Sequence, residues 1–257
     1  GWYLQTEIMS RAGEDDIGVR NEAQQQAEEL IKRILNSKPL ADMAVNPLLL
    51  TMIATVHRRG NVLPGKRVEL YKEICQVLLE RRQRAKKLPE PLTATQKQAV
   101  LQEIALGLMV HKRRGFILAD KVITFIGGKL TRVANKEITP EVFVQQIKDI
   151  CGLLVERELG IYEFAHLSFQ EYLAAVQIKE ANQEQFLLDN IDNSWWHETI
   201  RLYAAQTNAT NIIRKALEQA TVESLALAYD CAEEGLSADA AVRNQLEAKL
   251  EADLESR

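Results

Sequence analysis

Cysteine is scarce in this sequence: only three of its 257 residues are cysteines, and they lie far apart. An odd number of widely spaced thiols fits neither a disulfide framework nor the close ligand spacing of a zinc site. Cys75, Cys151 and Cys231 also fall in apolar patterns of helical spacing. We therefore expect reduced thiols in the core and a cytoplasmic protein.

Long apolar runs are also absent. The longest apolar stretches, such as residues 104–110 and 151–155, are far shorter than the roughly 20 residues that a transmembrane helix needs. The sequence begins with Gly1 rather than Met, and no basic and then apolar leader follows. We therefore expect no membrane partner, and we expect this sequence to be an internal part of a longer chain.

Charge is distributed unevenly along the sequence. Residues 1–92 have 15 Lys and Arg against 12 Asp and Glu, a net charge of +3. Residues 93–180 have 11 against 10, a net charge of +1, and residues 181–257 have 6 against 14, a net charge of −8. Such asymmetry is typical of separate units. We predict three domains: a first helical domain at 1–92, a winged-helix domain at 93–180, and a second helical domain or the start of a helical-repeat array at 181–257.

The first predicted domain has apolar residues at helical spacing. This pattern predicts helices at residues 22–35, from residue 46 onward, and at residues 68–84. Asn46 is expected to cap the second of these helices, and Pro47 to occupy its first position, where a missing N–H costs nothing. Residues 81–87 are a basic run at the end of the third helix, where positive charge suits the helix dipole.

The second predicted domain reads as helix, helix and hairpin, which is the layout of a winged helix. Thr93 and Gln96 match a capping box that opens one helix, and Thr139 precedes a proline that opens another. Two short β-like runs follow, at residues 153–157 and 161–164, with a glycine-containing turn between them. We predict a mainly α fold in which this hairpin is the only β-structure.

A strongly specified helix start follows the hairpin. Ser168 and Glu171 match a capping box, and Leu167 and Tyr172 have the spacing of a hydrophobic staple. Beyond residue 184 the apolar pattern predicts an array of α-hairpins without a repeat period that can be assigned.

Three strings carry a resemblance to a known family: NPLLL at 46–50, LPGKRVELY at 63–71 and FAHLSFQEYLAA at 164–175. The residues of these strings and their order along the chain resemble NACHT-family members of the STAND signal-transduction ATPases, an NLR-like group, in the region just after the nucleotide-binding core. The similarity covers approximately residues 20–205.

The resemblance implies that the Walker A lysine, the Walker B acidic pair and the sensor arginine lie upstream of this sequence. It implies a regulatory, non-catalytic half of a signalling ATPase that is not an enzyme alone, whereas the full-length protein is expected to be one. The expected cofactor of the full-length protein is ADP or ATP with Mg²⁺, and none is expected for this part alone. The expected partners are the P-loop ATPase core of the same chain and, in the active state, further copies; the sequence does not specify the effector.

Two glycine-containing segments imitate a P-loop. Gly60 to Lys66 has the right spacing, but Arg67 stands where a magnesium-binding Ser or Thr is needed, and Pro64 lacks an N–H that should hold phosphate. The run that ends at Lys129 has Ile123 in place of the required glycine. We predict no phosphate site at either segment.

Two residues are candidates for nucleotide contact in the complete protein. His166 precedes a strongly capped helix, where N–H groups attract phosphate. By position alone it reads as a half-buried packing histidine, whereas the resemblance implies a contact with the β-phosphate of ADP. Pro47 serves as a first-turn proline, and the resemblance adds a contact with adenine. Trp195 and Trp196 cannot both face one side of a helix, so we expect one in the core and treat both as interface candidates.

Two other functions compete with this interpretation. A winged-helix nucleic-acid-binding protein would read DNA with residues 140–172, but these carry two basic and six acidic residues, the wrong sign for phosphate. A helical scaffold for protein partners fits residues 181–257. We expect no nucleic-acid partner, and we expect His57, His111 and His197 to be structural because none has ligand spacing or a nucleophile nearby.

Overall fold

The computed structural model describes residues 17–58, 63–86, 92–117, 121–134 and 138–255. The chain forms two compact units, Gly1–Ile74 and Cys75–Arg257, so the border falls inside one helix, α5 (Arg67–Lys86). The borders predicted after residues 92 and 180 stay predictions. None of the described helices is long and apolar enough to cross a membrane.

The described residues of the first unit form three helices and the start of α5. They are α2 (Ile17–Leu35), α3 (Lys38–Ala44) and α4 (Pro47–Arg58). α2 packs against α3 and α4 and buries Val19, Ala23 and Leu30. α4 begins as predicted, because Asn46 Oδ1 accepts a hydrogen bond from the Leu49 N–H at 3.2 Å.

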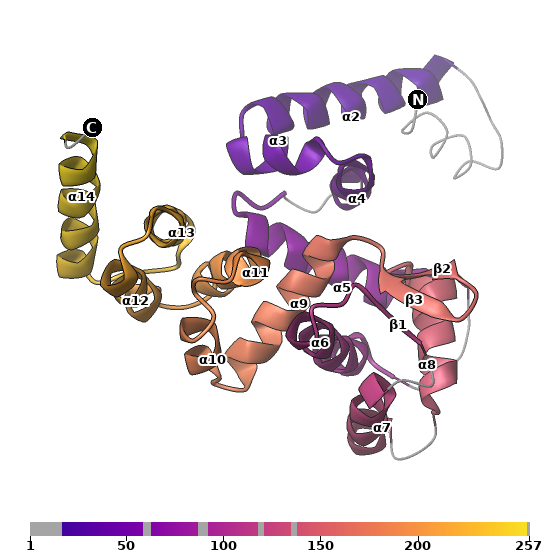
Figure 1. Cartoon of the computed structure of the whole chain (residues 1–257). Coiled ribbons are helices and arrows are strands. Elements are labelled where there is room, and N and C mark those ends of the chain that lie inside the picture. Colours follow the sequence, from indigo (N-terminus) through magenta and orange to yellow (C-terminus); the bar gives the residue numbers. More distant parts are fainter. Residues whose placement is uncertain (1–16, 59–62, 87–91, 118–120, 135–137, 256–257) are drawn as a thin grey trace. The chain divides into compact units, whose positions relative to one another are not determined.

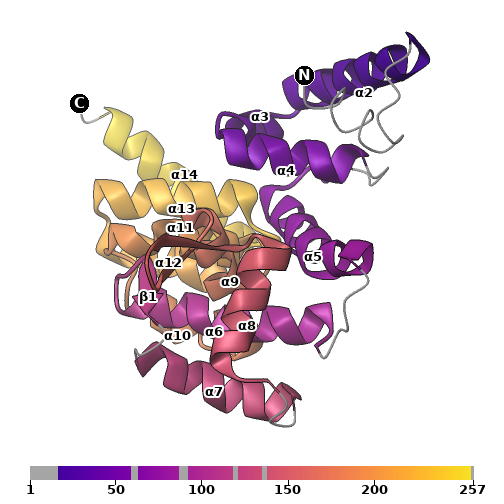
Figure 2. The same ribbon diagram turned by 90° about the vertical axis from the view of Figure 1, so that its right-hand side faces the viewer.

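In the second unit the rest of α5 is followed by the helices of the winged-helix part (Figure 2), which are α6 (Ala94–Val110), α7 (Lys121–Ala134), α8 (Pro140–Gln146) and the π-helical turn η1 (Ile147–Cys151). The predicted capping box is confirmed, since the Gln96 N–H donates to Thr93 Oγ1 at 3.2 Å and the Thr93 N–H donates to Gln96 Oε1 at 2.8 Å. Gly152 ends η1 in a left-handed conformation.

The sheet has three antiparallel strands in the order β1-β3-β2. The predicted hairpin is confirmed as β2 (Leu154–Glu158) and β3 (Ile161–Phe164). The expectation of no other β-structure is wrong, because β1 (Gly115–Ile117) pairs with the far side of β3. A strand of three residues is too short for its sequence pattern to predict it. Its position is set by a tertiary contact, in which the Phe116 and Tyr162 rings lie 5.9 Å apart between their centres.

Six helices follow the sheet: α9 (Leu167–Glu180), α10 (Glu184–Leu188), α11 (Ser194–Ala204), α12 (Thr210–Gln219), α13 (Val222–Glu234) and α14 (Ala240–Glu255). α9 packs against α11, and α11 against α13; α10 packs against α12, and α12 against α14 (Figure 1). The second unit therefore ends in a two-row stack of α-hairpins. α9 also packs against α6, so it joins the stack to the winged helix.

The three cysteines lie in the core, as expected. Cys75, Cys151 and Cys231 are buried, and no disulfide joins any two of them. Burial raises the pKa of the Cys75 and Cys231 thiols, so both are protonated at neutral pH. They act as small apolar core residues rather than as nucleophiles.

Candidate functional site

His166 lies between the end of β3 and the start of α9. It has an extended backbone, φ −147° and ψ 143°, and it is the N-cap residue of α9. Its Nδ1 accepts a hydrogen bond from the Ser168 N–H at 3.2 Å. The capping box predicted from Ser168 and Glu171 is wrong, because the helix begins earlier and an imidazole nitrogen supplies the cap. Histidine is rarely a preferred cap residue, so the sequence pattern did not reveal this role.

The cap fixes the protonation state of the His166 ring. An Nδ1 that accepts from an N–H carries no proton, so the neutral ring carries its proton on Nε2. Burial lowers the pKa of His166, and the positive charge of Arg114 lowers it further. At neutral pH the ring is therefore uncharged, with Nδ1 as an acceptor and Nε2–H as a donor.

This geometry changes how the start of α9 would meet an anion. The Ser168 N–H already donates to the His166 ring, and the Phe169 N–H donates to the His166 carbonyl at 3.1 Å. Both N–H groups therefore already have an acceptor within the chain, whereas we expected the N-terminus of α9 to offer N–H groups to a phosphate. A phosphate contact at this place would therefore run through the imidazole and not through these two backbone groups.

Pro47 is the first residue of α4 and is exposed. Its first-turn role is confirmed, and its carbonyl accepts a hydrogen bond from Thr51 Oγ1 at 2.9 Å. Pro47 belongs to the first compact unit and His166 to the second, so neither unit by itself defines a site that contains both. The adenine contact of Pro47 stays a prediction.

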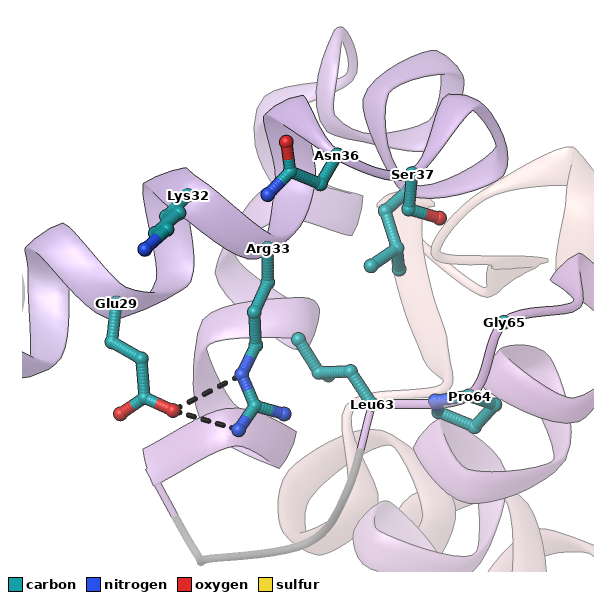
Figure 3. Close-up of a pocket in the computed structure, with 9 residues that line it drawn as sticks. Glu29, Lys32, Arg33, Asn36, Ser37, Leu63, Pro64 and Gly65 are labelled. Atoms are coloured by element: carbon teal, nitrogen blue, oxygen red, sulfur yellow. Dashed lines mark hydrogen bonds and ion pairs between the residues drawn. The ribbon is translucent and has the colours of Figure 1, made fainter.

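A cleft of about 420 Å³ lies beside the segment that imitates a P-loop (Figure 3). Leu63, Pro64 and Gly65 form one side; residues of α2 and the start of α3 form the other. Arg33 extends to Glu29 and pairs with its carboxylate at 2.7 Å. Pro64 offers no N–H to the cleft, and the guanidinium of Arg33 is paired with the Glu29 carboxylate. Residues 60–62 of the imitating segment lie outside the described residues.

His57 is buried next to the same cleft wall, with Nε2 at 3.8 Å from Glu29 Oε1. Burial lowers the pKa of His57, and Arg33 adds to this effect, while Glu29 opposes it. The ring therefore packs mainly as a neutral side chain. Its buried place agrees with the structural role expected for it.

A second cleft, of about 560 Å³, lies along the loops of the α-hairpin stack. Two of its carboxylate oxygens are engaged within the chain: Glu184 Oε2 accepts from Asn211 Nδ2 at 2.8 Å, and Asp239 Oδ1 accepts from the Ala241 N–H at 2.8 Å. These bonds tie helix starts together. Among the described residues no group of three or more His, Cys, Asp or Glu side chains is placed to hold a metal ion.

The two adjacent tryptophans have different environments. Trp196 is 2% exposed and packs edge-on against Phe186, at 4.8 Å between ring centres. Trp195 is half-buried, and its Nε1–H donates to the Met109 carbonyl in α6 at 2.9 Å. Trp196 thus belongs to the core of the second unit and presents almost no surface to a partner. An interface role for Trp195 stays a prediction.

The helices α6 to α8 and the three-stranded sheet together define a winged-helix domain. Residues 67–178 match the family model of the winged helix-turn-helix domain C-terminal to NACHT. This match supports the interpretation of this part of the chain as a NACHT-family segment that follows the ATPase core. No curated protein matches the chain.

The matched segment begins with α5, upstream of the border predicted after residue 92, and it ends within α9. His166 lies inside it, whereas Pro47, Trp195 and Trp196 lie outside. Of the four candidate residues, His166 is therefore the one that combines a family assignment with a defined hydrogen-bonding state.

Proposed function

We propose that this chain is the regulatory, non-catalytic half of a NACHT signalling ATPase and that it holds the ADP-bound, inactive state closed. In this proposal His166 donates from Nε2 to the β-phosphate of ADP, and Pro47 packs against the adenine. The nucleotide and its Mg²⁺ are held mainly by the ATPase core of the same chain. Exchange of ADP for ATP releases these contacts and permits self-association.

The observation that supports the proposal is the state of the His166 ring. Its Nδ1 is held by α9, so the ring is oriented and its remaining proton is on Nε2. A neutral donor facing an anionic phosphate oxygen makes a charge-assisted hydrogen bond, typically about 1.5–3 kcal/mol. The same ring begins α9, which packs against both α6 and α11. Loss of the phosphate would therefore act directly on the helix that joins the winged helix to the hairpin stack.

The test uses the complete protein with its ATPase core. His166→Ser keeps a good N-cap acceptor but is too short to replace Nε2, so folding is retained and the phosphate donor is lost. We expect ADP to dissociate roughly 5- to 150-fold faster, with higher basal self-association, as for a coupling energy of 1–3 kcal/mol. The measurement is the dissociation rate of a fluorescent ADP analogue, with self-association followed by light scattering.

His197→Ser is the matched control. This histidine contacts the Ile191 carbonyl through Nε2 at 3.0 Å and lies outside the matched segment. We expect it to leave ADP dissociation unchanged. If His166→Ser folds normally and releases ADP at the wild-type rate, then His166 does not contact the nucleotide and the proposal fails.

A further inference from the structure

A contact between two loops sets the step between two hairpins of the stack. A parallel bridge joins Asn208 in the α11–α12 loop to Ser237 in the α13–α14 loop, and Ser237 follows Asn208 by 29 residues. The Ala209 N–H donates to the Ser237 carbonyl at 2.8 Å, and the Leu236 N–H donates to the Ala204 carbonyl at 3.0 Å. The two loops are therefore bonded side by side, and a 29-residue step carries one hairpin onto the next.

One face of α11 is covered by α13. Arg201 reaches α13 directly, with Nη2 at 2.6 Å from Glu234 Oε1 and Nε at 3.5 Å from Asp230 Oδ2. Ile200 and Ala204 flank Arg201 on the helix and are fully buried. This face of α11 is the surface on which the next helix of the row stacks.

The corresponding face of α13 is open. A step of 29 residues carries Ile200 onto Tyr229, which is 52% exposed. Val222, seven residues before Tyr229, is 66% exposed, and Ala226 between them is also exposed. We call these three residues the α13 stripe. It lies opposite the buried face of α13, because residues three, four and seven apart share one side of a helix.

An apolar stripe at the end of a stack is unusual for an exposed surface. Repeat arrays become soluble at their ends by a polar outer face, whereas this end presents Val, Ala and Tyr at helical spacing. The acidic residues Glu223 and Glu233 lie beside the stripe and are exposed. A partner helix would therefore carry an apolar face with basic flanks, as Arg201 is placed against α13.

We propose that the α13 stripe is the docking surface for one further amphipathic helix, supplied by an α-hairpin that continues the row α9, α11 and α13. The continuity of the stack, with its loop-to-loop bridge, identifies this occupant. A second copy of the chain fits less well, because residues 181–257 carry a net charge of −8 and two such ends repel each other.

The test is the labelling rate of an engineered thiol. The native cysteines are buried, so Val222→Cys introduces a single accessible thiol on the stripe, and Leu159→Cys places a control thiol at the wing tip, where Leu159 is 99% exposed. Each variant is made in the 257-residue chain and in the full-length natural protein, and labelling with a maleimide is followed by mass spectrometry.

We expect the thiol at position 222 to react at least about tenfold more slowly in the full-length protein, because a covered thiol reacts only after local opening. The control thiol should react equally fast in both. Equal rates at position 222 would overturn the proposal. Slowing in the 257-residue chain that grows with concentration and accompanies a doubled mass would identify a second copy and overturn the proposed occupant.

Discussion

The cap made by His166 allows a prediction about the stability of the 257-residue chain. His166→Ala removes the ring nitrogen that accepts the Ser168 N–H, whereas His166→Ser supplies a hydroxyl in its place. Loss of an N-cap acceptor typically costs about 0.5–2 kcal/mol of unfolding free energy. We therefore expect His166→Ala to lose about 1 kcal/mol at pH 8, and His166→Ser to remain close to the wild type.

The cap also predicts a pH dependence. The folded-state pKa of His166 is lowered below its usual 6.5, so between that lowered value and 6.5 the unfolded chain binds more protons. The stability supplied by the neutral ring is fully present above pH 6.5 and is lost as the pH falls through the lowered pKa. His166→Ser has no titrating group at this position, so its stability should fall less between pH 8 and pH 5.

The assay is urea denaturation of wild type, His166→Ala and His166→Ser at both pH values. His57 also has a lowered pKa, but it is present in all three proteins, so the difference between wild type and His166→Ser isolates His166. A change of about 1 kcal/mol in the free energy of unfolding corresponds to a shift of roughly 2–4 °C in melting temperature for a domain of the size of the second unit. A His166→Ala protein as stable as the wild type, or a difference from His166→Ser that does not vary with pH, would refute the capping role.

Two further predictions concern packing in the second unit, and both are measured by urea denaturation. Trp195→Phe should lower the free energy of unfolding by about 0.5–1.5 kcal/mol, the net value of the hydrogen bond to the Met109 carbonyl. Trp196→Phe opens space in the core and should lower it further. Equal losses would contradict the different environments of the two rings. Gly235→Ala should lower the free energy of unfolding by about 1–3 kcal/mol, because the added Cβ would lie 2.4 Å from the Cys231 carbonyl oxygen. In Gly107→Ala the added Cβ in α6 meets nothing within 4 Å, so this change should raise the free energy of unfolding by about 0.5–1 kcal/mol. An unchanged stability of Gly235→Ala would show that the loop adjusts freely.

Local signals in the sequence predicted much of the fold. The Thr93 and Gln96 capping box, the Asn46 cap and the β2–β3 hairpin depend on residues within a few positions of one another. Such interactions are formed by neighbouring backbone groups, so spacing alone specifies them. The family resemblance was likewise carried by three short strings, and the match over residues 67–178 supports its NACHT assignment.

Contacts between distant residues decided the rest. β1 exists because Phe116 and Tyr162 meet across the sheet; Trp196 rather than Trp195 enters the core because α10 supplies Phe186. The α13 stripe became visible only when the Asn208 to Ser237 bridge set the step between hairpins. At His166 the sequence identified the residue, but only the structure showed that its ring caps α9, because a histidine's hydrogen-bond partners depend on how its ring is turned and buried rather than on its neighbours in the chain.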